Sequence, residues 1–454
     1  MKKILALFLL LSIVISLVGC QQPSKSFLNG ESLENFSIVY SAEDTDYAKR
    51  AAEYIKSEIF SRTGLDLPII TDAEPEAQCE IVVGNTNRAI SERLDAKTVG
   101  LEFAILAEAG KVALEGDYFI IAAAAYFFID KYVPYDDFNA EIPTSVSIHT
   151  PIVKEANNFI LLIGDGMGEN HTKMFEYFEN NVEYGDGEDT FYGYYLPYMG
   201  YSRTASLSGV TDSAAGGTAL SCGIKTYNEY IGRDKDLNDV KSLTELASEL
   251  GMSAGVMSTE TNSGATPSAF SAHADSRDSK NDIMQSQADS KVKYGTIIDC
   301  GYDYYNTRYM GIIENHISDT LSKLEKNENG FFLMYEEAHT DKHSHNNDLE
   351  SAFSAMVRFN QAIGRFMEYA FYNPDTMVII TADHETGELY PEDGELKYHY
   401  DDHTGANVLV FAYGYGAEVF NGKEIENIQI AHTIASYMGD DNFGDQSEFG
   451  RLNK

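Results

Sequence analysis

Phe159-Ile160-Leu161-Leu162-Ile163, followed directly by Gly164-Asp165-Gly166-Met167-Gly168, is the stretch that decides the fold. An unbroken apolar run without polar alternation is typical of a strand buried on both faces, as in a parallel sheet. Similar runs return at 254–258, 330–335, 377–381 and 408–413. Helical spacing separates them, notably over 242–250, 312–325 and 349–372. The alternation predicts an α/β domain over 151–454, with a mainly parallel central sheet flanked by helices.

A different pattern precedes this domain, and 454 residues leave room for two domains. Short apolar runs predict strands over 36–40, 67–71, 80–84, 103–106 and 112–114. Helices are expected over 47–60 and 123–132, with 119–122 as either a strand or a helix start. Residues 27–150 are therefore predicted to form a small α+β domain. Residues 134–152, which include Pro143 and Pro151, are expected to be the connector.

The first domain carries no paired carboxylates at recognisable positions, so a packing or binding module is the preferred interpretation. Its segment 47–71, together with Ile81-Val82-Val83-Gly84-Asn85-Thr86-Asn87-Arg88, resembles the accessory domain ahead of some glycoside hydrolase catalytic domains. This resemblance implies a glycan contact by residues 27–150.

The N-terminus has the pattern of an export signal. Met1-Lys2-Lys3 is charged, residues 4–18 are apolar, and Leu17-Val18-Gly19-Cys20 ends the run. That ending resembles a bacterial lipobox, which implies a signal peptide over 1–20, lipid on Cys20 and a tether over 21–26. The expected location is the extracellular face of the bacterial cell membrane. An ordinary cleaved signal is the alternative.

The charge balance limits the choice of partners. The chain has 33 basic and 71 acidic residues, for a net charge of −38. Such a surface excludes nucleic acid and anionic lipid headgroups as expected partners. It also repels phosphorylated compounds, so a site for them must concentrate positive charge locally.

A serine stands at a predicted helix start in Val210-Thr211-Asp212-Ser213-Ala214-Ala215-Gly216-Gly217-Thr218-Ala219. Unpaired N–H groups and the positive end of the dipole make a helix N-terminus a phosphate site. Small-residue helix starts are common, however, so this stretch alone does not establish a catalytic serine.

Acids and histidines follow the predicted strands of the α/β domain. They are Asp165, Glu336, Asp341, His345, Asp383, His384 and His403. Each alone is more often structural, but parallel strands bring their carboxyl ends to one sheet edge. Carboxylate with imidazole suits zinc, and carboxylate with hydroxyl and water suits magnesium. The set predicts a metal centre.

From residue 157 to the end, the chain resembles the alkaline phosphatase family. The matching pieces stand in family order: Gly164-Asp165-Gly166-Met167-Gly168, Thr211-Asp212-Ser213-Ala214-Ala215, Ala265-Thr266-Pro267 with Ala272-His273 and Arg277, Glu336 with Asp341 and His345, Asp383-His384, and His403-Thr404-Gly405. The resemblance implies hydrolysis of small phosphate monoesters through a phosphoserine intermediate, at a site with two zinc ions and one magnesium ion.

The resemblance also implies a role for each site residue. Ser213 is the expected nucleophile, and Arg277, steadied by Asp212, is the expected phosphate clamp. The first zinc is assigned to Asp341, His345 and His403. The second zinc is assigned to Asp165, Asp383 and His384, together with the Ser213 oxygen. The magnesium is assigned to Asp165, Thr266 and Glu336.

The chain departs from the family in four places. Relatives often carry Asp or His where this chain has Gly264, so we expect the magnesium to be held less tightly than the two zinc ions. Lys342 is either a water-mediated phosphate contact or a solvated lysine. His343 could compete with His345, which alone fits the family spacing. The segment 384–403 is shorter than usual, which implies an open substrate mouth.

Three alternatives stay open at this stage. A phosphodiesterase or another hydrolase of the same superfamily, such as a sulfatase, is one, although Ser213-Ala214-Ala215-Gly216-Gly217 lacks the proline and arginine of sulfatases. A glycan-binding surface lipoprotein with an inactive phosphatase-like domain is another. The third open point is the oligomeric state, which the sequence does not decide and which could be a homodimer.

Overall fold

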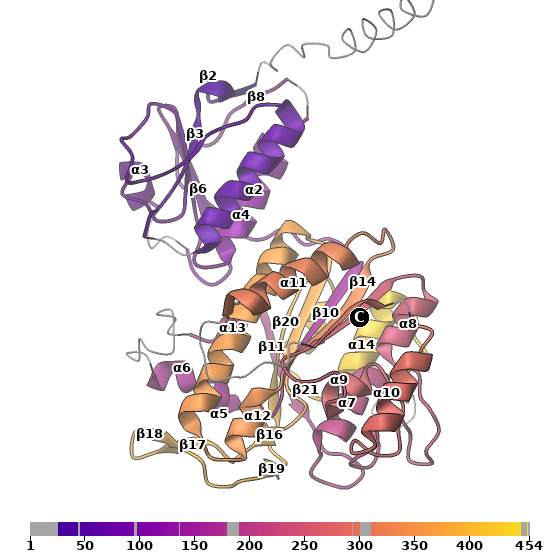
Figure 1. The fold of residues 1–454 in the computed structure, drawn as a ribbon. Coiled ribbons are helices and arrows are strands. Elements are labelled where there is room, and N and C mark those ends of the chain that lie inside the picture. The colour runs from indigo at the N-terminus through magenta and orange to yellow at the C-terminus, as the bar shows by residue number, and fades with distance from the viewer. Residues whose placement is uncertain are drawn as a thin grey trace, which may run out of the picture. The chain divides into compact units, whose positions relative to one another are not determined.

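The computed structural model describes residues 26–43, 46–94, 98–135, 137–178, 190–292, 294–299, 310–445 and 452. The predicted signal peptide, Cys20 and most of the predicted tether lie outside these residues. The chain divides into two compact units, Met1–Pro151 and Ile152–Lys454, each described by itself (Figure 1). Among the described residues, no helix has both the length and the apolar character needed to span a bilayer.

In the described part of the second unit, eight strands form the central sheet. Their order is β13 (Tyr294–Asp299), β12 (Ser253–Ser258), β14 (Phe331–Glu337), β10 (Asn158–Gly164), β15 (Thr376–Thr381), β20 (Val408–Tyr413), β11 (Tyr198–Arg203) and β21 (Glu424–Glu426). The strands from β13 to β15 are parallel to one another. β20 runs antiparallel to both β15 and β11, and β21 is parallel to β11. The prediction of a mainly parallel sheet is confirmed.

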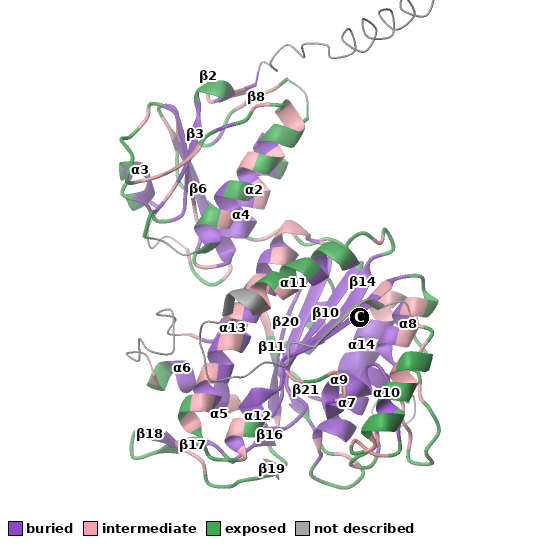
Figure 2. Cartoon of the chain, viewed as in Figure 1, coloured by how far each residue is buried: buried purple, intermediate pink, exposed green. Residues whose placement is uncertain are grey.

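Helices cover both faces of this sheet (Figure 1). One face packs against α11 (Met310–Leu324) and α13 (Leu349–Tyr372). The other packs against α7 (Ser213–Cys222), α8 (Leu243–Glu249), α9 (Ala265–Ala269) and α14 (Ile428–Met438), with α10 (Lys280–Asp289) nearby. Short helices α5 (Glu169–Thr172), α6 (Met174–Tyr177) and α12 (His339–Ser344) follow strands. Figure 2 shows the sheet buried and the outward sides of the helices exposed.

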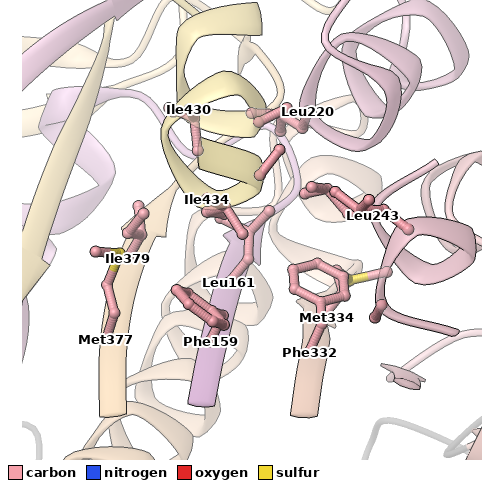
Figure 3. Close-up of a cluster of buried hydrophobic side chains, with 14 of the residues drawn as sticks. Phe159, Leu161, Leu220, Leu243, Phe332, Met334, Met377, Ile379, Ile430 and Ile434 are labelled. Atoms are coloured by element: carbon pink, nitrogen blue, oxygen red, sulfur yellow. The ribbon is translucent and has the colours of Figure 1, made fainter. Parts of the chain in front are cut away.

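The core shows why an unbroken apolar run was needed in β10. Phe159 and Leu161 pack toward α14 and α8, where Ile434 and Leu243 meet them (Figure 3). All residues of β10 are buried, so the residues between these two are covered on the opposite face. Burying such side chains contributes about 1.5–3 kcal/mol each.

A mixed sheet forms the centre of the first unit. Its order is β4 (Ile69–Thr71), β3 (Ser37–Tyr40), β5 (Glu80–Val83), β7 (Lys111–Glu115), β6 (Phe103–Glu108) and β9 (Ser147–His149). The helices are α2 (Asp46–Thr63), α3 (Ala89–Glu92) and α4 (Ile120–Tyr132). A smaller sheet joins β1 (Phe27–Leu28), β2 (Glu31–Ser32) and β8 (Asn139–Ala140).

The structure differs from the sequence prediction at the expected connector and decides the open assignment of segment 119–122. The segment expected as a connector contains β8 and β9, which pair with β1 and β6 and belong to the sheets of the first unit. Segment 119–122 belongs to a helix, since α4 begins at Ile120. The strands β11, β13 and β21 and the helix α14 were not anticipated, because they are short or mix polar with apolar residues.

Candidate metal centre and nucleophile

The predicted site residues lie at one edge of the sheet, where the parallel strands have their carboxyl ends. Asp165 follows β10, Glu336 lies at the end of β14, and Asp383 follows β15. His403 precedes β20 along the chain, and because β20 runs antiparallel to β15 it reaches the same edge. Figure 1 shows α7, α9, α12, β16 (Glu385–Thr386) and β19 (His403–Thr404) gathered at this end.

Asp341, His345 and His403 form the first group, with ligand atoms all within 4.8 Å of one another. The two Nε2 atoms are 3.1 Å apart, and each lies 3.4 Å from Asp341 Oδ1. His345 Nδ1 donates to the Asp401 carbonyl at 2.7 Å, and His403 Nδ1 donates to the Thr211 carbonyl at 2.9 Å. Carbonyls only accept, so Nδ1 carries a proton in each ring and Nε2 is the atom that faces the carboxylate. Metal-binding histidines are commonly oriented in this way. Despite burial, Asp341 raises the pKa of His403 to about 9, so a metal would displace a proton from that Nε2.

Asp165, Asp383 and His384 form the second group, also within 4.8 Å. His384 Nε2 lies 3.3 Å from Asp383 Oδ2 and 3.5 Å from Asp165 Oδ1. Thr386 Oγ1 donates to Asp341 Oδ1 at 2.6 Å and lies 3.2 Å from His384 Nδ1. The threonine hydroxyl has one proton, so it accepts from Nδ1 and leaves the Nε2 lone pair facing the two carboxylates.

A third set of oxygens lacks hydrogen-bond partners. Within the described residues, the buried atoms without a partner include Asp165 Oδ1, Thr266 Oγ1, Glu336 Oε1 and Asp383 Oδ2. Each unpaired buried group costs about 1–3 kcal/mol. Carboxylate and hydroxyl oxygens are the ligands that magnesium accepts. The donor sets therefore fit the two zinc ions and the magnesium ion that the sequence predicts.

Ser213 is the first residue of α7 and is 2% exposed. Asp212 caps the helix by accepting from the Ala215 N–H at 2.9 Å. Ser213 Oγ lies 3.1 Å from His384 Nε2, at the margin of the second group. The predicted helix start thus brings the serine hydroxyl to the same place as the predicted metal ligands.

Two glycines let α7 approach its neighbours closely. A Cβ at Gly216 would meet the Asp383 carbonyl oxygen at 3.0 Å. One at Gly217 would meet Ala269 Cβ at 3.1 Å and Thr266 Cα at 3.3 Å. Larger residues would push the helix, and with it the serine, away from α9 and the end of β15.

Arg277 is held beside Ser213 by Asp212, the residue that caps α7. Its Nη1 donates to Asp212 Oδ2 at 3.2 Å, and this oxygen also accepts from the Glu229 N–H at 2.9 Å. Burial alone would lower the pKa of the guanidinium, but Asp212 and Asp165 raise it above its ordinary value. The side chain remains 33% exposed, so its donors are accessible to a bound anion.

The chain's own groups leave this pocket negatively charged. Burial raises the pKa of Asp165 well above its ordinary value, and Asp383 and other carboxylates add to the shift. Burial and the charge on Asp341 raise the pKa of Asp383 to about 6. Burial and His403 lower the pKa of His384 well below its ordinary value, so that ring stays neutral. Such a pocket takes up either protons or cations.

Sequence reasoning missed three contributors to this edge. Thr386 joins the two zinc-type groups, Ser258 donates to Glu336 Oε2, and Glu260 pairs with Lys342. Ser258 and Glu260 lie at the end of β12, so the rule that strand ends carry functional residues could have found them. His343 belongs to neither ligand group, whereas His345 does.

A family model for alkaline phosphatase matches residues 156–299 and 312–394, together half of the chain. Alkaline phosphatases 3 and 4 of Bacillus subtilis (strain 168) are both 31% identical to the chain, over 287 and 299 residues. These matches cover 51% and 54% of this chain and 62% and 65% of the relatives, so the chain spans less than two thirds of their length.

Solved structures agree with this match. Alkaline phosphatase from the Antarctic bacterium TAB5 is 27% identical, with a TM-score of 0.55, covering 64% of this chain and 100% of that one. A TAB5 variant with one histidine replaced by glutamate, 27% identical with a TM-score of 0.52, has Mg bound in its M3 site. The enzyme from Thermus thermophilus, 16% identical with a TM-score of 0.54, shares the fold. The chain therefore belongs to the alkaline phosphatase family.

Proposed function

We propose that the chain hydrolyses phosphate monoesters, with Ser213 as the nucleophile and a phosphoserine as the intermediate. The observation that carries this proposal is the position of Ser213 Oγ. It lies 3.1 Å from His384 Nε2, at the N-terminus of α7 and beside two convergent ligand groups. Membership of the alkaline phosphatase family supports the same reaction.

The reaction has two steps. Ser213 Oγ attacks phosphorus, a new Oγ–P bond forms, and the bond from phosphorus to the ester oxygen breaks, so that the alcohol leaves with a proton. A water molecule then attacks the phosphoserine. Its oxygen bonds to phosphorus, the Oγ–P bond breaks, and inorganic phosphate leaves while the serine regains its hydroxyl.

Three sets of residues would hold the cations. They are Asp341, His345 and His403 for one zinc, Asp165, Asp383 and His384 for the second, and Asp165, Thr266 and Glu336 for magnesium. When bound, these cations supply the charge that favours an ionised serine and stabilises the entering and leaving oxygens. The orientation of the Nε2 atoms and the unpaired carboxylate oxygens support this assignment.

Arg277 and the helix start would bind the remaining phosphate oxygens. The guanidinium is held by Asp212, which orients its planar fork, and two parallel N–H donors match two oxygens of a phosphate. The first N–H groups of α7 have no partner within their own helix and favour an anion at its N-terminus. A monoester offers more free oxygens for these donors than a diester.

The substitution Ser213→Ala tests the covalent route. We expect turnover of p-nitrophenyl phosphate to be almost lost while zinc content and thermal unfolding stay unchanged. Acid quenching should trap phosphate on the wild type and none on the variant, and Ser208→Ala, in an exposed loop, serves as the control. Wild-type turnover in Ser213→Ala would reject the nucleophile. Faster turnover of bis-p-nitrophenyl phosphate than of the monoester would indicate a phosphodiesterase instead.

The same proposal includes a lipid anchor on Cys20, which would hold the enzyme on the outer face of the bacterial membrane. Its support is the sequence Leu17-Val18-Gly19-Cys20 after an apolar run. Replacing Cys20 with serine should release the protein or leave its precursor uncleaved. Processed Cys20→Ser protein that stays on the membrane would contradict the anchor.

Glycan contact by residues 27–150 and assembly into a homodimer complete the proposal. Retention of the full chain on immobilised polysaccharide, and loss of that retention after deletion of the first unit, would support the glycan contact. Light scattering of the purified protein measures the mass of the assembly directly. A monomeric mass would reject the dimer.

A further inference from the structure

The starting point is Gly264, whose backbone does not require glycine. Gly264 is the N-cap of α9, with φ −58° and ψ 161°, a conformation open to any residue. A side chain here would have to displace that of Glu260. A Cβ at this position would lie 1.8 Å from Glu260 Oε1 and 2.3 Å from Glu260 Cδ. The carboxylate of Glu260 therefore fills the place where a side chain at 264 would begin.

The backbone of Glu260 is tied to Glu336 through Ser258, and its carboxylate acts on the charges of Glu336 and Asp165. The Glu260 N–H donates to Ser258 Oγ at 3.0 Å, and Ser258 Oγ in turn donates to Glu336 Oε2. Gly264 lies two residues before Thr266, whose Oγ1 is buried and has no hydrogen-bond partner. Glu260 thus lies next to the residues that would hold magnesium, in the loop that leads from β12 to Thr266.

The carboxylates near Gly264 are not fully offset by the neighbouring cations. Glu260 pairs with Lys342, which is 43% exposed. Two further carboxylates, Asp165 and Glu336, are buried in the same neighbourhood, and after burial itself Glu260 is among the charges that raise the pKa of both. Lys280 and Arg277 also act on Glu260 and Asp165, yet the pKa values of Asp165 and Glu336 stay raised, so the cluster is suited to a divalent cation.

We propose that Glu260 is a positioning residue of the magnesium site, supplying negative charge and a hydrogen-bond acceptor for the water that magnesium retains. The inference rests on the proposed function in one respect, which is that a third cation binds. It changes the expectation drawn from Gly264, because the missing side chain at 264 is replaced by a carboxylate from 260. The third ion is then held more tightly than the sequence suggested.

Calorimetric titration of the zinc-loaded full chain with Mg²⁺ tests this role. Glu260→Gln keeps the shape and removes the charge, and it should weaken Mg²⁺ binding by about 10–100-fold, as for other partners of metal-site groups. The control is Glu249→Gln, since Glu249 pairs with Lys241 at 2.7 Å on the exposed surface. Its Mg²⁺ affinity should equal that of the wild type. Equal affinity in Glu260→Gln and wild type would overturn the inference.

Two further variants separate Glu260 from its neighbours. If Glu260 acted only by holding Lys342, Lys342→Met would weaken Mg²⁺ binding as much as Glu260→Gln does. Our inference requires Mg²⁺ affinity in Lys342→Met to stay equal or rise, because a competing cation is removed.

The double variant Glu260→Ala, Gly264→Asp moves the carboxylate four residues along the same loop and should recover most of the lost Mg²⁺ affinity. If the double variant binds Mg²⁺ no more tightly than Glu260→Ala, a carboxylate at 264 does not replace the one at 260, which contradicts the inference. A wild-type chain that binds no third cation would overturn both the magnesium site and the role of Glu260. A different outcome would separate the two proposals. If Glu260→Gln loses Mg²⁺ affinity but the wild type hydrolyses only diesters, the proposed monoester reaction is rejected and the magnesium site with Glu260 is retained.

Discussion

Glu336 and Glu337 are consecutive residues of β14, and both carboxylates are buried. Glu337 lies 3.3 Å from Arg358 Nη2 of α13 and 3.4 Å from His339 Nδ1 of α12, both measured to its Oε1. The Arg358 cation and the hydrogen bond to His339 overcome the effect of burial and lower the pKa of Glu337 to about 2. Glu336 faces α9, where burial and Glu260 raise its pKa well above its ordinary value.

A buried carboxylate that the fold itself neutralises is structural, whereas one that it leaves without a cation is a candidate for binding. On the α13 side the chain supplies its own cations, so the buried carboxylate is neutralised within the fold. On the α9 side it supplies a serine hydroxyl and further carboxylates, which leave a buried charge uncompensated. Buried charges are costly unless paired, so the second arrangement is stable only with protons or bound cations. The predictions that follow test this contrast.

Removing the metals should affect only the α9 side, with the largest effect. Chelation should abolish phosphatase activity and lower the free energy of unfolding. An ion present at a thousand times its dissociation constant contributes about 4 kcal/mol. Activity assays and denaturant unfolding, before and after Zn²⁺ and Mg²⁺ are added back, measure both effects. Full activity in a chelated, metal-free sample would remove the basis of the comparison.

The substitution Glu337→Gln should destabilise the fold and leave the metals bound. It would leave Arg358, only 12% exposed, without its carboxylate, and breaking a buried pair costs about 3–5 kcal/mol. Glu336→Gln is the matched change one residue away. It should lower Mg²⁺ affinity and leave the metal-free protein equally or more stable, because it relieves repulsion. Similar unfolding curves for the two metal-free variants would contradict the contrast.

The pH dependence of the metal-free protein should have opposite signs on the two sides. The pKa of Glu337 is depressed from 4.5 to about 2, so its contribution is present above pH 4.5 and is lost as the pH falls toward 2. That contribution is about 3 kcal/mol. The pKa of Asp383 is raised from 3.8 to about 6, so its contribution is present below pH 3.8 and is lost as the pH rises toward 6. The free energy of unfolding of the metal-free protein should be measured across pH 2–7. Glu337→Gln should remove the loss of stability at low pH, and Asp383→Asn should remove the loss of stability as the pH rises toward 6.

The smallest effect is expected for Arg277→Ala, which removes the side-chain cation that the α9 side offers to phosphate. A charge-assisted hydrogen bond contributes about 1.5–3 kcal/mol. Inhibition by inorganic phosphate should weaken by at least about tenfold, while zinc content and thermal unfolding stay unchanged. Unaltered inhibition would show that Arg277 does not contact the bound phosphate.

Much of this could be predicted from the sequence, because the signal was local. Unbroken apolar runs such as 159–163 specify buried strands, and the residues that follow them converge at one edge in any parallel sheet. Asp165, Asp383 and His384 could be found by that rule. The resemblance to a known family added Thr266 and Arg277.

The remainder depended on tertiary contacts. His403 was named as a ligand from the sequence, but the antiparallel direction of β20, which brings it to the shared edge, is encoded by no local pattern. The position of the Glu260 side chain beside Gly264 depends on how the loop between β12 and α9 folds back on itself, which the sequence pattern does not show. Likewise β9 pairs with β6 over a long separation, so a stretch expected as a connector became a strand.

The close contact between α7 and α9 at Gly217 has a consequence for motion. With Thr266 Cα 3.3 Å from the Cβ position of Gly217, the two backbones touch without an intervening side chain that could rotate to absorb a shift. We expect the two helices to open to solvent together, as one cooperative unit. Their amide hydrogens should then show a common free energy of opening in deuterium exchange, with Ser213 and Thr266 exposed in the same event.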